Sequence, residues 1–138
     1  MIGVVDASVA LSWFLKDEHT AASEHLLDQV VAQGAVVPSL WRLEVANALQ
    51  IGIRLQRISP AYRDAAIQRL TELLIEVDPE TDTRAWNNTL HLADLHRVTV
   101  YDACYLELAL RRNLPLATRD SALATAAANA GITLLPAS

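Results

Sequence analysis

The sequence predicts an α/β fold, a three-layer sandwich with a central parallel five-stranded sheet flanked by helices. Five short apolar runs, rich in β-branched residues, alternate along the chain with segments of helical periodicity. These runs lack polar alternation, which is typical of strands covered on both faces in a parallel sheet. No repeat or linker interrupts the pattern, and a length of 138 residues suits one domain. We therefore expect residues 1–138 to form a single domain.

Each expected strand is short and bounded by residues that end it. In chain order, the five strands are Ile2–Val5, Ala35–Val37, Leu73–Val77, Leu114–Thr118 and Ile132–Leu135. Pro38 ends the second strand and Pro79 follows the third, since proline lacks the N–H group that a sheet ladder needs. The first and fourth strands are followed by polar residues and then by helical segments, as in β-α-β units.

The segments between the strands carry apolar side chains at the spacing of a helix packed on a sheet. By number, they cover residues 9–14, 21–33, 40–58, 60–70, 81–96, 103–112 and 121–129. Gly34 is placed to end the second helix, and Ser59-Pro60 to begin the fourth. Asp102 is expected to open the very apolar helix 103–112, which we expect to be central.

Composition excludes several classes of protein. Hydrophobic residues make up 52% of the chain and charged residues 20%, which is enough apolar material for a full core and excludes general disorder. The net charge of −5 argues against a protein that holds nucleic acid by bulk electrostatics, although an enzyme can bind it transiently. The single cysteine, Cys104, excludes an internal disulfide and fits a reducing compartment. With no signal peptide and no membrane-spanning run, we expect a cytoplasmic protein without a membrane partner.

Four acids stand out because each lies at an apolar segment or at the end of a strand, where a charge is expensive: Asp6, Glu44, Asp102 and Asp120. Taken singly, the three aspartates precede helices and are explained as N-caps. Glu44 lies too far into its helix to cap it. If the sheet order reverses beside the first strand, Asp6 and Asp120 become neighbours. Carboxylates about 5 Å apart repel by roughly 3 kcal/mol per pair, so such a cluster requires protonation or a cation. Carboxylate ligands favour Mg²⁺ or Mn²⁺.

Four motifs together resemble the PIN-domain ribonucleases, and most of all the VapC toxins of toxin–antitoxin pairs. They are Asp6-Ala-Ser-Val, Glu44-Val-Ala-Asn-Ala-Leu49, Val100-Tyr-Asp-Ala-Cys-Tyr-Leu106 and Leu116-Ala-Thr-Arg-Asp120. No single motif is specific, but the four occur in order over nearly the whole chain. The resemblance implies that Asp6, Glu44, Asp102 and Asp120 are catalytic and bind the metal. It assigns supporting roles to Ser8, Asn47 and Thr118.

The resemblance also implies an activity and partners. The expected reaction is endonucleolytic cleavage of RNA by water activated with one or two Mg²⁺ or Mn²⁺ ions. The expected partners are the RNA substrate, a cognate VapB-like antitoxin and a second copy of the chain in a homodimer. Two alternatives stay open: a PIN-fold RNA-processing nuclease without an antitoxin, and a catalytically inert α/β interaction module whose acids merely cap helices.

Other groups have simpler explanations. Arg119 is a candidate RNA contact. A solvated position at a helix end is the alternative explanation for Arg119 and for the similarly placed Arg111 and Arg112. His91 and Asp94 are three residues apart on a helix, but surface positions explain them better than a zinc site. An aspartyl-phosphate enzyme also places an acid after the first strand. The chain opposes that class, since its only lysine is Lys16 and the class requires a lysine late in the sequence.

Overall fold

The computed structural model describes residues 1–138 and contains one parallel sheet of four strands. The strands are β1 (Val4–Val5), β2 (Ala35–Val37), β3 (Ile75–Val77) and β4 (Leu116–Ala117). Their order across the sheet is β3-β2-β1-β4, and every neighbouring pair is parallel. The chain therefore crosses over between strands through helices, which is the arrangement expected from the alternating sequence pattern.

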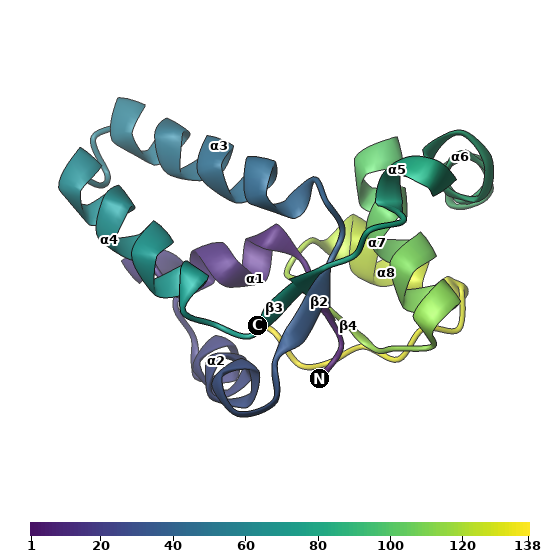
Figure 1. The fold of residues 1–138 in the computed structure, drawn as a ribbon, viewed down its shortest axis with the longest axis horizontal. Coiled ribbons are helices and arrows are strands. Elements are labelled where there is room, and N and C mark those ends of the chain that lie inside the picture. The colour runs from purple at the N-terminus through teal and green to yellow at the C-terminus, as the bar shows by residue number, and fades with distance from the viewer.

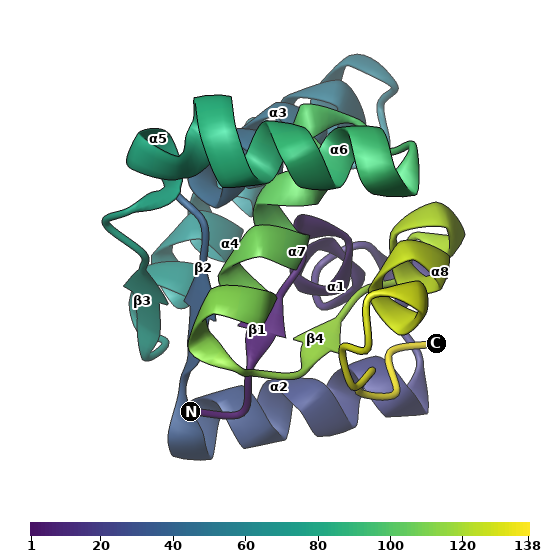
Figure 2. The same ribbon diagram turned by 90° about the vertical axis from the view of Figure 1, so that its right-hand side faces the viewer.

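Helices cover both sides of the sheet, which confirms the predicted α/β architecture. They are α1 (Ala7–Ser12), α2 (Ala21–Gln33), α3 (Trp41–Arg54), α4 (Pro60–Thr71), α5 (Thr81–Arg84), α6 (Leu90–His96), α7 (Val100–Arg112) and α8 (Ser121–Asn129). Figure 1 shows α1 to α4 on one side of the strands and α5 to α8 on the other. Turned by 90°, α7 passes in front of the strands, α5 and α6 lie above them and α8 lies to the side of β4, with α3 and α4 at the back (Figure 2). None of these helices combines the length and apolar character needed to cross a bilayer.

The prediction of a fifth strand is wrong. The segment Ile132–Leu135 contributes only an isolated parallel bridge, between Leu116 and Leu134. Two backbone hydrogen bonds tie the segment to β4, from the Leu116 N–H to the Thr133 carbonyl and from the Leu135 N–H to the Leu116 carbonyl, each 2.9 Å long. No further hydrogen bond joins the segment to β4 beyond Leu135, which directly precedes Pro136.

The centre of the sheet is the most deeply buried part of the molecule. Val4 and Val36 are paired in register, and both are fully buried within a core cluster of 28 residues. On the other side of β1, Val5 is paired with Ala117 of β4. Asp6 and Thr118 follow that pair directly, so the ends of β1 and β4 lie side by side. The expected reversal of strand order beside the first strand is confirmed.

Helix α7 is central, as predicted, but it begins earlier than the apolar run suggests. Its residues 103–109 are all buried. The N-cap is Thr99, whose hydroxyl accepts a hydrogen bond from the Asp102 N–H at 3.1 Å. Asp102 therefore lies inside the first turn and does not cap the helix, which corrects the expectation that it opens it. Its carboxylate is left free for another role.

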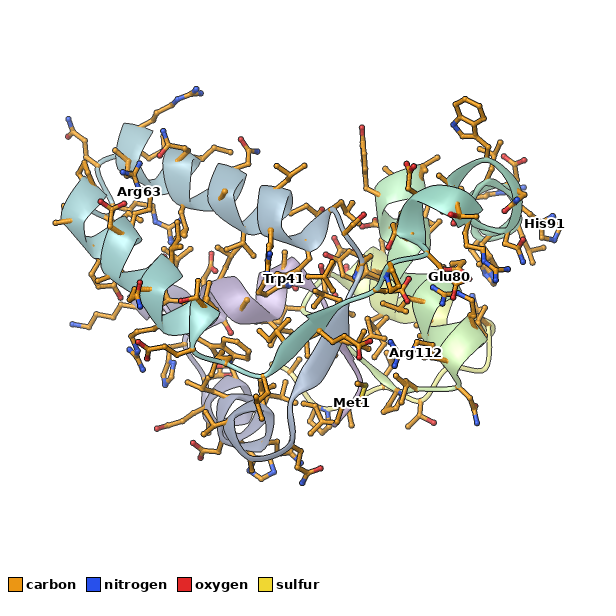
Figure 3. The ribbon with its side chains drawn as sticks, viewed as in Figure 1. Met1, Trp41, Arg63, Glu80, His91 and Arg112 are labelled. Carbon is orange, nitrogen blue, oxygen red and sulfur yellow. The ribbon has the colours of Figure 1, made fainter.

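A buried ion-pair network fixes α7 against the end of β3. Arg111 donates to Asp78 at 2.6 Å and to Glu107 at 2.7 Å, and these carboxylates are only 2% and 5% exposed. Arg112 also pairs with Glu76 of β3. Figure 3 shows Glu80 and Arg112 on the same side of the sheet as α7. Both arginines at this helix end thus pair with carboxylates, and their role as phosphate contacts stays a prediction.

Candidate active site

Asp6 lies at the N-terminus of α1, immediately after β1, and is 7% exposed. It occupies the N-cap position, but its side chain makes no capping hydrogen bond. Instead, its Oδ2 accepts hydrogen bonds from two hydroxyls, Ser8 Oγ at 2.9 Å and Thr118 Oγ1 at 2.6 Å. The capping explanation for Asp6 is therefore wrong at the level of its side chain. The carboxylate is held in a fixed orientation at the edge of the sheet.

The same two hydroxyls also fix the loop that follows β4. The Arg119 N–H donates to Ser8 Oγ at 3.0 Å, and the Asp120 N–H donates to Thr118 Oγ1 at 3.0 Å. Each hydroxyl thus accepts one backbone N–H and donates to Asp6. This arrangement couples the position of Asp120 to that of Asp6.

Glu44 reaches the site from the first turn of α3 and is partly buried. Its Oε1 accepts a hydrogen bond of 2.5 Å from the hydroxyl of Tyr105 on α7, while Oε2 receives none. Burial raises the pKa of Glu44 above its ordinary value, and the nearby charges of Asp6 and Asp102 raise it further. The hydrogen bond from Tyr105 acts in the opposite direction.

Asp102 and Asp120 enter the site from the N-termini of α7 and α8. Asp120 is exposed and caps α8, since its Oδ1 accepts a hydrogen bond from the Leu123 N–H at 2.9 Å. Asp102 is partly buried. Burial raises the pKa of Asp102, and repulsion from Asp120 and Asp6 adds to the effect. The charge of each of these acids thus influences, or is influenced by, at least one of the others.

None of the four acids has a basic side chain within salt-bridge distance. Burial raises the pKa of Asp6, which the hydrogen bonds from Thr118 and Ser8 only partly oppose. No salt bridge involves any of the four; by contrast, the buried Asp78 and Glu107 share Arg111. A buried acid that serves only the fold is expected to be neutralised in the latter way. The site acids therefore require protonation or an external cation to relieve their repulsion.

The donor set fits a hard divalent cation. The site offers carboxylate oxygens, which are the ligands that Mg²⁺ and Mn²⁺ prefer. No three acidic, histidine or cysteine side chains are drawn together as a compact metal-binding group. Mg²⁺ keeps much of its water shell and commonly binds through one or two carboxylates.

Two of the other residues predicted for this site contact Asp6, and the roles of two more stay predictions. Ser8 and Thr118 contact Asp6, as a supporting role requires. Asn47 is exposed and its side chain makes no hydrogen bond, so its role stays a prediction. The Arg119 guanidinium donates to the Glu18 carbonyl, which leaves its role in RNA binding a prediction as well. Tyr105 was not predicted as a site residue. A tyrosine one helical turn after Asp102 on an apolar helix is a sequence signal that could have identified it.

Comparison with known proteins gives a consistent result. Ribonuclease VapC1 of Mycobacterium tuberculosis, in strains CDC 1551 / Oshkosh and H37Rv, is 37% identical to this chain over 89 residues. The alignment covers 64% of this chain and 65% of the relative, so it spans slightly less than two thirds of that protein's length.

Two solved structures and one family model also match. The crystal structure of PAE2754 from Pyrobaculum aerophilum has a TM-score of 0.67 at 24% identity, covering 90% of this chain and 83% of that one. The crystal structure of FitAcB from Neisseria gonorrhoeae has a TM-score of 0.61 at 17% identity, covering 96% of each chain. At these identities the likeness supports the fold alone. The PIN domain model matches residues 3–129, which is nearly the whole chain, and this chain therefore belongs to the PIN-domain family.

Proposed function

We propose that this chain is a Mg²⁺- or Mn²⁺-dependent endoribonuclease of the VapC type. The observation that carries the proposal is electrostatic. Four carboxylates lie near the edge of the sheet where β1 and β4 end, and none forms a salt bridge. Burial raises the pKa of Asp6, Glu44 and Asp102, and repulsion from neighbouring acids adds to the effect at Glu44 and Asp102. A divalent cation relieves this repulsion and makes the charged forms favourable.

Each residue has a distinct role in the proposed mechanism. Asp6, Asp102 and Asp120 would be the principal metal ligands. Glu44 would ligate directly or through water, or would help to position the attacking water. When bound, the ion lowers the pKa of water and neutralises charge that develops on the phosphate. Ser8 and Thr118 hold the Asp6 carboxylate in place by hydrogen bonds to its Oδ2. Two hydroxyl donors limit the motion of that ligand and favour its charged form.

RNA is the proposed substrate and an antitoxin the proposed partner. The similar protein from Mycobacterium tuberculosis is named a ribonuclease, and its sequence match supports the same substrate class here. By the same likeness, we assign the chain to a type II toxin–antitoxin pair, acting in the cytoplasm as a homodimer and inhibited by a VapB-like protein. The free thiol of the buried Cys104 is compatible with that compartment.

The experiment that tests the nuclease is end-mapping on cellular RNA. Purified chain is incubated with total RNA in Mg²⁺ or Mn²⁺, and new ends are mapped against the Asp6→Asn variant and a chelated control. Asp82→Asn serves as the matched control, because Asp82 is an exposed acid outside the site. Metal-dependent ends that vanish in Asp6→Asn and persist in Asp82→Asn support the proposal. If wild-type chain produces no such ends, or Asp6→Asn produces them equally, the inert-module alternative is preferred.

The toxin role is tested separately in cells. Expression of the wild-type chain is expected to arrest growth, and Asp6→Asn is expected to abolish the arrest. Co-expression of the product of an adjacent short reading frame should restore growth. RNA cleavage in vitro without growth arrest would instead favour an RNA-processing nuclease that has no antitoxin.

A further inference from the structure

We propose that Tyr105 is a positioning residue for the metal site, which its hydroxyl serves by holding the Glu44 carboxylate. This inference rests on the proposed function. The hydroxyl donates to Glu44 Oε1 at 2.5 Å, and the two residues are 61 positions apart. The contact joins α7 to α3, the two helices that carry Asp102 and Glu44.

The surroundings of Tyr105 make its hydroxyl a donor. The side chain is fully buried in the core, so its ring is fixed by packing. A tyrosine phenol is protonated at neutral pH, and this one directs its proton to Glu44 Oε1. A rigid donor of this kind orients an acceptor more strictly than water does.

Helix geometry links Tyr105 to a second ligand. Tyr105 follows Asp102 by three residues, which places both on one face of α7. The same helix thus supplies one carboxylate directly and controls another through its hydroxyl. Tyr105 donates to Oε1 of Glu44, and Oε2 accepts no hydrogen bond, so Oε2 would be free to face a bound ion or its water. Residues that orient a ligand in this way commonly change metal affinity or activity by about 10- to 100-fold when altered.

The test removes the hydroxyl and keeps the ring. Tyr105→Phe is titrated with Mn²⁺ alone, without RNA, and free Mn²⁺ is measured by electron paramagnetic resonance. We expect the dissociation constant for Mn²⁺ to rise about 10-fold, with the melting temperature measured on the same samples. Tyr62→Phe is the matched control, because the Tyr62 hydroxyl donates at 2.6 Å to the Phe14 carbonyl, outside the site. Its Mn²⁺ affinity should equal that of the wild type.

A double-mutant cycle shows whether Tyr105 acts through Glu44. In a Glu44→Ala background, the further change Tyr105→Phe should alter the Mn²⁺ dissociation constant by less than about 2-fold, because the group it positions is gone. A loss of about 10-fold in that background would mean that Tyr105 acts by another route, and would overturn the inference.

The outcomes separate the inference from the proposed function. If the wild type binds Mn²⁺ and Tyr105→Phe binds it equally well, the inference fails and the proposed function stands. A change in melting temperature with unchanged Mn²⁺ affinity also overturns the inference, since it assigns Tyr105 a packing role only. If the wild type binds no Mn²⁺ and cleaves no RNA, the proposed function fails and the inference falls with it.

Discussion

The hydroxyl of Thr118, at the end of β4, donates a hydrogen bond of 2.6 Å to Oδ2 of Asp6, at the end of β1, across 112 positions of the sequence. The same hydroxyl accepts the Asp120 N–H. One side chain thus joins a candidate ligand on β1 to the backbone of another after β4. This link through Thr118 requires that β1 and β4 be neighbours in the sheet.

Replacing Thr118 with valine is expected to weaken both the site and the fold. The variant keeps the shape of the side chain but leaves Asp6 without one donor and the Asp120 N–H without its acceptor. We expect a loss of about 1–2 kcal/mol in the free energy of unfolding and about a 10-fold loss or more in cleavage rate. Urea unfolding and RNA cleavage measure the two effects. Thr125→Val is the control, since its hydroxyl only contacts the Ser121 carbonyl on exposed α8; equal effects of the two variants would contradict the prediction.

Neutralising Asp102 is expected to stabilise the metal-free chain. Asp102 is repelled by Asp120 and Asp6, and Asn removes that repulsion with little change of shape. We expect the free energy of unfolding in chelator to rise by roughly 1 kcal/mol, which corresponds to about 4 °C in melting temperature. Millimolar Mg²⁺ should stabilise the wild type and have less effect on the variant. Asp94→Asn, on exposed α6, should match the wild type in both conditions.

The increase in the free energy of unfolding that Asp102→Asn brings should become larger as the pH rises. The folded chain raises the pKa of Asp102 above the ordinary value of 3.8, so the folded state binds the proton more tightly than the unfolded state does. The stability from this group is fully present below pH 3.8 and is lost as the pH rises through the folded pKa. In metal-free buffer, the stability gap between variant and wild type should therefore open as the pH rises. Urea midpoints over a pH series measure it, and a gap that narrows with rising pH would sink the prediction.

Removing Arg111 is expected to be far more damaging than removing Arg112. Arg111→Met leaves the buried Glu107 without its ion pair and Asp78 with only the more distant Arg112, at 3.9 Å, as a counter-charge. Breaking a buried ion pair in this way costs about 3–5 kcal/mol. Arg112 pairs with Glu76, which is half exposed, so Arg112→Met should cost less than about 1 kcal/mol. Urea unfolding of both variants compares the two directly. Similar losses of unfolding free energy in the two variants would show that burial of the Arg111 network contributes little to stability.

Local signals predicted most of the elements. Gly34, with φ of 77°, ends α2 as expected, and Ser59 caps α4 with Pro60 in its first turn. These features depend on the conformational preferences of one or two residues, so they can be predicted from the sequence. The prediction of a fifth strand was wrong because a strand needs a hydrogen-bonded partner along its length. The segment Ile132–Leu135 forms only one bridge before Pro136.

Burial of charge was the least predictable feature. Asp78 and Glu107 gave no signal in the sequence, because their neutralising partner, Arg111, lies 33 and four positions away and is brought to both only when α7 docks beside β3. The four site acids were visible because each interrupts or ends an apolar run. An acid among apolar neighbours is unusual on its own, whereas an acid that a distant arginine neutralises is not.

The sequence by itself determined the alternation of strands and helices and the positions of Asp6, Glu44, Asp102 and Asp120 along them, because these follow from local periodicity. Only the tertiary structure decided that β4 lies beside β1, that Thr118 reaches Asp6 and that Tyr105 reaches Glu44. Strand order and helix docking depend on the packing of segments distant in the sequence. The contacts that orient the candidate ligands therefore exist only once the sheet is assembled and both of its faces are covered.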